Sequence, residues 1–214
     1  MPKFTYKKEH GEFVIYEDGA VMKTPNGAIV KTTDETFANK LITTLPDYTS
    51  PKSLLTYHYT YCNLKERYTK VQLIEMFSNH AKKEILMDDE YLMFRQSSPI
   101  KEPIAEVFES QLGDLFTQLN MYQLSAIFVT NYVFNSWMLP YYIISDIIIP
   151  MQENDGSDFK TLKEDFLNDL EEYEKDEFIY YTGENGELDH REDLSLIIEA
   201  FVQYFMFSII LENQ

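Results

Sequence analysis

The chain has 214 residues, of which 44% are hydrophobic and 25% are charged, a composition typical of a folded globular protein rather than a disordered one. Acidic side chains outnumber lysine and arginine by 36 to 18, and this net charge of −18 disfavours binding to nucleic acid or to anionic membranes. The charge is uneven, because residues 1–101 carry 14 basic and 13 acidic side chains whereas residues 102–214 carry 4 and 23. The acidic half either keeps the surface soluble or favours a partner with a basic face.

The single cysteine, Cys62, excludes an intramolecular disulfide and fits a reducing compartment. The first ten residues contain neither an apolar signal segment nor an arginine-rich amphipathic stretch. We therefore expect a cytoplasmic protein in a bacterium, or a mitochondrial matrix protein if the source is eukaryotic and the chain is already processed. We also expect a monomer that is not inserted in a membrane.

Short strands joined by tight turns are predicted near the start of the chain. A β-rich run at 12–16 is followed by Asp18-Gly19, a dipeptide typical of two-residue hairpin turns, and by a partner strand at 20–23. A second turn at 24–27 leads into a third strand at 28–31. Three strands in a meander are expected.

Helices are predicted after this meander. Thr32 and Glu35 have the spacing of a capping box, which favours a helix over 34–44. Pro46 and Pro51 bracket a loop. Between residues 64 and 86, apolar side chains recur at helical spacing, namely Val71, Ile74, Phe77 and Ala81.

Beyond residue 100 the pattern is helical almost throughout. The most apolar segment, Met121–Ile149, is interrupted by polar residues and has no flanking basic cluster, so we expect two buried helices broken near Pro140 rather than a membrane span. An acidic helix is predicted over 159–173 and a strongly apolar one over 194–211. An apolar stripe precedes them, formed by Ile104, Val107, Phe108, Leu112 and Phe116.

Two polar connections, at 152–157 and 182–189, separate these helices. The predicted fold class is α+β. A small β-rich N-terminal domain with one or two helices is expected over residues 1–98, and an all-helical domain over residues 99–214.

Known catalytic sequence motifs are absent. The chain has no glycine-rich phosphate loop, no paired-cysteine motif and no zinc-protease or serine-hydrolase signature, and its four histidines lie in different predicted elements. A carboxylate cluster on the acidic helix could hold a divalent metal or could be a solvated face. No histidine lies on that helix, which favours the solvated face. The cluster consists of Glu171, Glu172, Glu174, Asp176 and Glu177.

Two sequence blocks resemble a known family. The first is Asp18-Gly19 followed by Lys23-Thr24-Pro25, with Phe37-Ala38 beginning twelve residues after the proline. The second is Asp89-Glu90-Tyr91-Leu92-Met93-Phe94-Arg95. Together they are similar to the ATP-twelve family, the assembly chaperones that bind the α subunit of the ATP synthase catalytic head. The blocks lie within the first hundred residues.

The resemblance implies a binding protein and not an enzyme, with no cofactor and no metal, whose partner is the free ATP synthase α subunit. The family's functionally important glutamate would fall between residues 170 and 185, but its neighbouring tryptophan and glutamine are missing here. Glu177 is the first candidate for that role and Glu172 the next, with Asp176 and Glu171 beside them. We further expect an aromatic contact surface around Tyr57, Tyr59 and Tyr61.

Three alternatives remain at this stage. The first is a lineage-specific interaction module with another partner, and the second is a hydrolase that uses the carboxylate cluster with or without a metal. The third, a membrane-inserted protein, is disfavoured by a mean hydropathy of −0.33.

Overall fold

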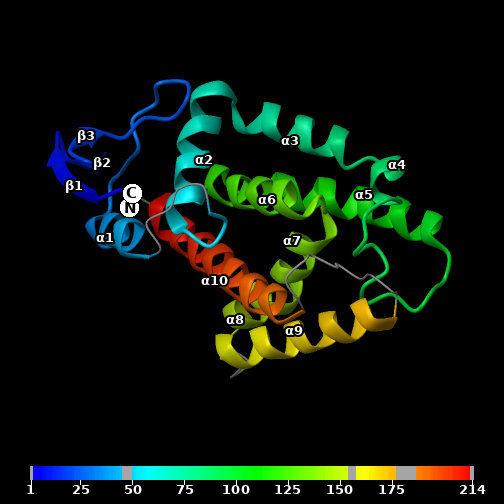
Figure 1. Ribbon diagram of the computed structural model, residues 1–214. Coiled ribbons are helices and arrows are strands. Elements are labelled where there is room, and N and C mark those ends of the chain that lie inside the picture. The colour runs from blue at the N-terminus through cyan, green and yellow to red at the C-terminus, as the bar shows by residue number, and fades with distance from the viewer. Residues whose placement is uncertain (1, 45–49, 154–157, 177–186, 213–214) are drawn as a thin grey trace.

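A computed structural model describes residues 2–44, 50–153, 158–176 and 187–212. Its fold is α+β, as predicted, with a small antiparallel sheet followed by a mostly helical region. Figure 1 shows the sheet and the first helix at one end of the molecule and the longer helices extending away from them. The predicted fold class is therefore confirmed.

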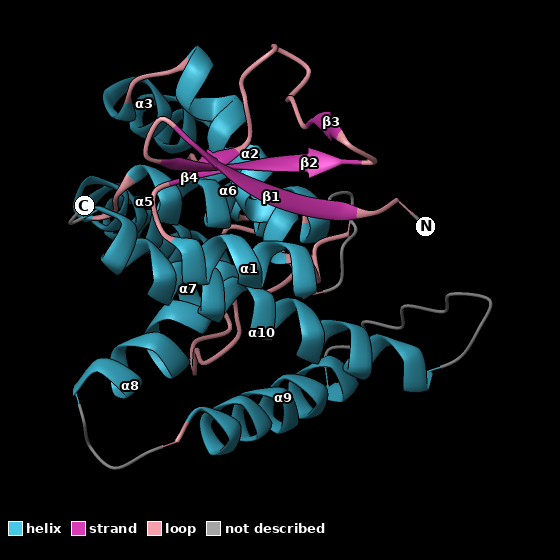
Figure 2. Ribbon diagram, turned by 90° about the vertical axis from the view of Figure 1, so that its left-hand side faces the viewer, coloured by secondary structure: helices cyan, strands magenta, loops and turns pink. Residues whose placement is uncertain are grey.

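The central strand of the sheet is β2 (Glu12–Glu17). It pairs along its whole length with β1 (Phe4–Glu9), a strand that the sequence pattern had not revealed. On its other side it pairs with β3 (Ala20–Val21) and then with β4 (Lys31–Thr32), and the hairpin around Asn26-Gly27 projects between them. Figure 2 views the molecule from the side of the sheet and shows the strands lying across the helices, with α3 above them and α1 below.

Tight turns in the sheet depend on left-handed backbone conformations. Asp18 and Gly19 have φ values of 49° and 83°, and both are positive as a type I′ hairpin turn requires. His10 and Gly11 make the turn between β1 and β2 in the same way, with φ values of 50° and 91°. The His10-Gly11 pair is a weaker sequence signal than Asp-Gly, which explains why β1 was missed.

Helix α1 spans Glu35–Thr43 and is capped by Asp34, whose carboxylate accepts a hydrogen bond from the backbone N–H of Phe37. The predicted capping box of Thr32 and Glu35 is therefore wrong. The N-cap is Asp34, because aspartate is preferred to threonine at this position. The helices that follow are α2 (Leu54–Arg67), α3 (Lys70–His80), α4 (Lys83–Leu86), α5 (Lys101–Gln118) and α6 (Met121–Phe134).

The predicted break near Pro140 lies a few residues earlier. Helix α6 ends at Phe134, and its C-cap, Asn135, adopts the left-handed conformation with φ 49°. Pro140 sits in the first turn of the next helix, α7 (Met138–Ile143), where a missing N–H is tolerated. The chain then continues through a π-helical segment, η1 (Ile144–Ile148), and α8 (Ile149–Glu153).

The acidic helix α9 (Phe159–Asp176) and the apolar helix α10 (Glu187–Glu212) complete the described chain. Residues 191–212 are long and apolar enough to cross a membrane, but 56% of that window is buried inside the protein. Helix α10 packs against α2, α6 and α9, as a core helix of a folded domain does. Figures 1 and 2 both show it running through the helical region above α9.

Buried apolar side chains form one continuous cluster that reaches from Phe4 in β1 to Leu211 in α10. Side chains on both sides of the predicted boundary at residue 98 belong to this cluster, including Leu92, Phe94, Ala105 and Phe108. The sheet and the helices therefore share a core.

Candidate functional site

A surface groove of about 480 Å³ lies between α5 and the α7–η1 helix, and we call it the α5–η1 groove. Its base contains the aromatic rings of Phe108 and Tyr142, which meet edge to face at 6.0 Å. The Tyr141 hydroxyl donates a hydrogen bond across to Gln111 at 3.1 Å and joins the two walls. The groove is lined by Arg95, Gln96, Ser98, Pro103, Ile104, Val107, Phe108, Gln111, Tyr141, Tyr142, Ser145 and Asp146.

The α5 wall exposes apolar side chains. Val107 is 55% exposed and Ile104 is half-buried, while Ile100, on the same side by helical spacing, is 60% exposed. The stripe predicted from the sequence therefore divides into two faces. The core face consists of Ala105, Phe108, Leu112 and Phe116, all buried.

Ile100 is an unusual residue for its position. It is the N-cap of α5 and makes no side-chain capping hydrogen bond, although serine, threonine, aspartate and asparagine are strongly preferred there. An exposed isoleucine at an N-cap gains neither a cap nor burial. The local stability of α5 therefore does not explain this isoleucine, which precedes the groove-lining residues Pro103 and Ile104.

The opposite wall contains the π-helical segment η1. Its Ser145 and Asp146 line the groove, while Ile144, Ile147 and Ile148 are buried in the core. A π-helical insertion in an α-helix shifts the register of the side chains and occurs frequently at functional sites. Here it lets the isoleucines face inward and a carboxylate face the groove.

Asp89 anchors this wall from the interior. The residue is 3% exposed, and its carboxylate accepts hydrogen bonds from the Ser136 hydroxyl at 2.7 Å and from the backbone N–H groups of Trp137 and Met138 at 2.7 and 3.1 Å. It also accepts one from the N–H of Tyr91. Burial raises the pKa of Asp89, while these hydrogen bonds act in the opposite direction. Asp89 thus fixes the start of α7 to the 89–95 segment.

Arg95 ends that segment at the rim of the groove. Its guanidinium donates to Asp146 of η1 at 3.1 Å and to Asp169 of α9 at 2.6 Å. Arg95 has a φ of 67°, a left-handed conformation that non-glycine residues rarely adopt. The ion pair between Arg95 and Asp146 therefore joins two stretches of irregular backbone, the left-handed residue Arg95 and the π-helical segment η1.

The lining of the groove carries one cation and one carboxylate, Arg95 and Asp146, whereas the glutamates of α5 lie on the face of that helix turned toward Lys83. Helix α5 carries four carboxylates and one lysine. Lys83, next to α5, is held by Glu102 at 2.7 Å and by Glu106 at 2.8 Å. Lys83 and Arg95 are thus each shared between two carboxylates, which leaves an excess of negative charge at the surface.

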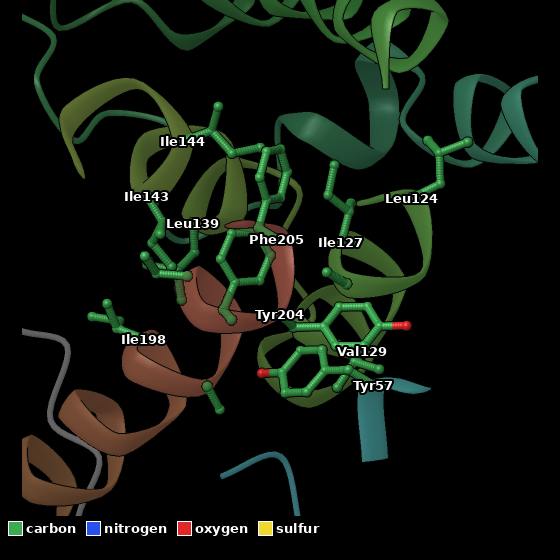
Figure 3. Packing of buried hydrophobic residues seen from close by; sticks show 14 of the residues in the cluster. Tyr57, Leu124, Ile127, Val129, Leu139, Ile143, Ile144, Ile198, Tyr204 and Phe205 are labelled. Atoms are coloured by element: carbon green, nitrogen blue, oxygen red, sulfur yellow. The ribbon is translucent and has the colours of Figure 1, made fainter. Parts of the chain in front are cut away.

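The aromatic surface predicted around Tyr57, Tyr59 and Tyr61 is corrected by the structure. These residues lie on α2, where Tyr57 is fully buried and Tyr61 is 6% exposed. Figure 3 shows Tyr57 packed against Tyr204 of α10, and the two rings stack with centroids 5.6 Å apart. Tyr59 is partly buried against the same core. Tyr57 and Tyr61, one helical turn apart, face α10 and α6 and are buried there, so these two rings stabilise the fold and are not open to a partner.

His58 lies in this aromatic cluster. Its Nε2 lies 2.9 Å from the carbonyl oxygen of Lys31, and its Nδ1 lies 3.3 Å from the Tyr204 hydroxyl. A carbonyl only accepts, so Nε2 carries the proton and Nδ1 accepts from Tyr204. Burial lowers the pKa of His58 to about 4, and the imidazole is neutral at neutral pH. It links β4 to α10 and does not face solvent.

The predicted carboxylate cluster on α9 is only partly described. Glu171 is exposed and accepts from Arg191 of α10 at 2.7 Å, and Glu172 is exposed. Asp176 is the last residue of α9, but its side chain and all of Glu177 lie outside the described residues. Within the described ranges, no three histidine, cysteine, aspartate or glutamate side chains gather as a metal site would require.

The two blocks that carry the family resemblance occupy different places. In the first, Asp18 and Gly19 form the β2–β3 turn, and the Thr24 hydroxyl accepts from the N–H of Ala28 at 3.2 Å. Lys23 and Pro25 are exposed in the hairpin between β3 and β4. Turn formation accounts for these residues without a ligand.

In the second block, Phe94 is buried and meets the rings of Tyr142, Phe166 and Tyr173 edge to face. The Glu90 side chain is exposed, and its carbonyl oxygen accepts a hydrogen bond from Tyr173. Together with Asp89 and Arg95, these residues build one side of the groove and its support. The second block, unlike the first, is therefore part of the candidate site.

Sequence reasoning missed Ile100, Tyr141, Asp146 and Asp169 as site residues. The available signal was Ile100 at the start of α5, where a polar cap is expected and an apolar residue stands. Comparison of the chain with protein-family models, with curated proteins and with solved structures finds no match.

Proposed function

We propose that this protein is an assembly chaperone that binds the free α subunit of an ATP synthase catalytic head and shields its β-subunit interface until assembly. The observation that carries the proposal is the exposed side chain of Val107 beside the half-buried Ile104 on α5, within a strongly acidic half of the chain. An apolar strip surrounded by charge is typical of a protein-binding surface.

The character of this surface fits reversible binding. A chaperone has to cover apolar surface on a subunit that would otherwise aggregate, and then has to release it. The groove is partly polar and has the ion pair of Arg95 and Asp146 at its rim, whereas permanent interfaces are more apolar, so its composition favours a reversible interface. The acidic helices accelerate the approach of a basic partner through long-range attraction, which salt weakens.

The partner's identity rests on the sequence resemblance. Of its two blocks, the one over 89–95 supplies Arg95 at the rim and Asp89 behind the wall. The proposal therefore connects the residues that resemble the chaperone family with the surface that we propose for binding. The binding role is proposed to be non-catalytic and to need no cofactor.

The experiment is size-exclusion chromatography of the purified chain with the α and β subunits of the same organism, each alone and then both together. We expect a complex with α alone, no complex with β alone, and loss of the α complex when β is added. A correctly folded chain that binds neither subunit would contradict the proposed partner and favour an interaction module for another protein.

A further inference from the structure

We propose that the α5–η1 groove binds a basic amphipathic helix, and that Arg95 occupies the place of that helix's cationic side chain in the free protein. This inference rests on the proposed binding function, but it does not depend on the partner being the ATP synthase α subunit.

A helical occupant follows from the shape of the groove. Both walls are helices, and three apolar side chains, those of the N-cap Ile100, the half-buried Ile104 and the exposed Val107, follow each other at i, i+4 and i+7, over about two helical turns. No described strand edge lies among the residues that line the groove. An apolar ridge of another helix fits between two helical walls in the way that amphipathic helices dock in grooves.

The apolar contacts come from three side chains. Ile104 and Val107 on one wall and Tyr141 on the other face the same space, and Phe108 and Tyr142 close its base. The volume of about 480 Å³ accommodates a few side chains rather than a whole helix. The occupant therefore inserts one apolar face and leaves its polar face in water.

A cationic side chain on the occupant follows from the carboxylates. Asp146 and Asp169 lie on η1 and α9, two helices that pack against each other, and Arg95 bonds to both carboxylates. The Asp169 side chain is 45% exposed and the Asp146 side chain 26%, so a basic side chain arriving from solvent can reach them. Their mutual repulsion is relieved by whichever cation lies between them.

Arg95 is the cation that does this in the free protein. Its side chain is 38% exposed, so its ion pairs are of the surface kind, each contributing at most about 1 kcal/mol to folding. Such a guanidinium can be exchanged for a lysine or arginine of the partner at little cost to the fold. Arg95 then competes with the partner, and its removal strengthens binding.

The first test uses two synthetic amphipathic helices about 18 residues long, one of leucine and lysine and one of leucine and glutamate. NMR titration of the wild-type chain is expected to show binding of the lysine peptide, with shifts centred on residues 98–111 and 141–146, and no binding of the glutamate peptide. Failure of the lysine peptide to bind, or shifts centred elsewhere, would overturn the proposal.

The second test compares Val107→Asp with Val71→Asp. Both valines are exposed on helices, Val71 to 72% on α3, so each variant adds the same charge without disturbing the core. We expect Val107→Asp to weaken binding of the lysine peptide at least about tenfold and Val71→Asp to change it less than about twofold. Equal weakening by both, with thermal melts showing folded proteins, would overturn the proposal.

The third test is Arg95→Gln. We expect this variant to bind the lysine peptide about three- to tenfold more tightly, with a steeper salt dependence, because two carboxylates become available. Weaker binding would mean that Arg95 itself contacts the partner, and the inferred cation exchange would be wrong. Repeating the three tests with the free α subunit separates the two proposals. If the peptide binds at the groove and the α subunit does not bind, only the proposed partner is wrong. If the α subunit binds Val107→Asp as tightly as the wild type, only the proposed place of binding is wrong.

Discussion

Two aromatic regions of this molecule behave in opposite ways. The cluster of His58, Tyr57 and Tyr204 is closed to solvent, because its rings are buried where α2 packs against α10. The α5–η1 groove also contains tyrosines, but its Tyr141 is only partly buried and its neighbour Val107 is more than half exposed. Tyrosine-rich sequence predicted a contact surface at the first region, whereas the open apolar surface lies at the second.

The difference comes from how many elements cover each helix. Helix α2 is covered by α1, α6 and α10, so several of its faces are buried. Helix α5 buries one stripe and leaves a second stripe uncovered, which continues to Ile100 at its N-cap. Aromatic content alone therefore indicates burial as readily as binding. An apolar residue where a polar one is locally preferred is the more specific sign of a surface for a partner.

The largest expected effect is on the closed cluster. Tyr57→Ala removes a fully buried ring, and we expect a loss of about 3–5 kcal/mol in the free energy of unfolding, because the cavity cannot collapse completely. Urea denaturation monitored by circular dichroism measures it. Tyr141→Ala in the groove is the matched control and should cost less than about 1.5 kcal/mol. Similar losses in both variants would remove the distinction between a closed and an open region.

Asp89→Ala tests the support behind the groove. The substitution leaves the Ser136 hydroxyl and the N–H groups of Trp137 and Met138 buried without their acceptor, and we expect a loss of about 3 kcal/mol. Trp137, the only tryptophan of the chain, is 3% exposed, so its fluorescence should shift to the red if the start of α7 loosens. An unchanged emission maximum and an unchanged urea midpoint would show that Asp89 does not hold the wall.

Acid should lower the free energy of unfolding through His58, which lies in the closed cluster. Burial lowers the pKa of His58 from 6.5 to about 4, so the unfolded chain binds a proton in this window that the folded chain does not. The stability that neutral His58 contributes is therefore fully present above about pH 6.5 and is lost as the pH falls towards 4, by about 3 kcal/mol at most. Asp89, whose pKa is raised by burial, acts in the opposite direction near the acid end.

Urea midpoints at several pH values between 4 and 7 measure this dependence. The matched variant is His58→Gln, whose amide stays neutral throughout and should be less stable at pH 7 but nearly independent of pH in this window. If the variant keeps the acid sensitivity of the wild type, another group is responsible.

The smallest expected effect is a gain in stability, whereas the substitutions above reduce it. Ile100→Asp supplies the missing N-cap of α5 and should raise the free energy of unfolding by about 1 kcal/mol. The same substitution removes an exposed apolar side chain beside the groove, so binding of the lysine peptide should weaken while stability rises. A variant that is more stable and binds as well as the wild type would show that Ile100 has no part in the site.

Much of the fold could be predicted from local sequence. Asp18-Gly19 predicted its hairpin turn because few other dipeptides adopt two successive positive φ angles. The acidic helix α9 follows from apolar spacing, since Phe166 and Leu170 repeat every helical turn and are buried. The first strand, β1, was missed because its turn contains His10 instead of an asparagine or aspartate.

The site was harder to predict because it depends on contacts between distant residues. Arg95 meets Asp146 and Asp169 across 51 and 74 residues of sequence, and no spacing rule connects them. The π-helical register of η1 is equally hidden, because its isoleucine-rich sequence fits an ordinary helix. Exposure of Val107 follows from the packing of α5, whereas its sequence pattern is that of a core residue.

The central claim is that partner contact occurs at the α5–η1 groove and not at the aromatic residues of α2. Hydroxyl-radical footprinting of the side chains, with and without the free ATP synthase α subunit, tests it most directly. The account predicts protection of Ile104, Val107 and Tyr141, with Val71 unchanged as the exposed reference. Protection confined to the acidic face of α9 around Glu172, with Val107 still fully reactive in the complex, would contradict it.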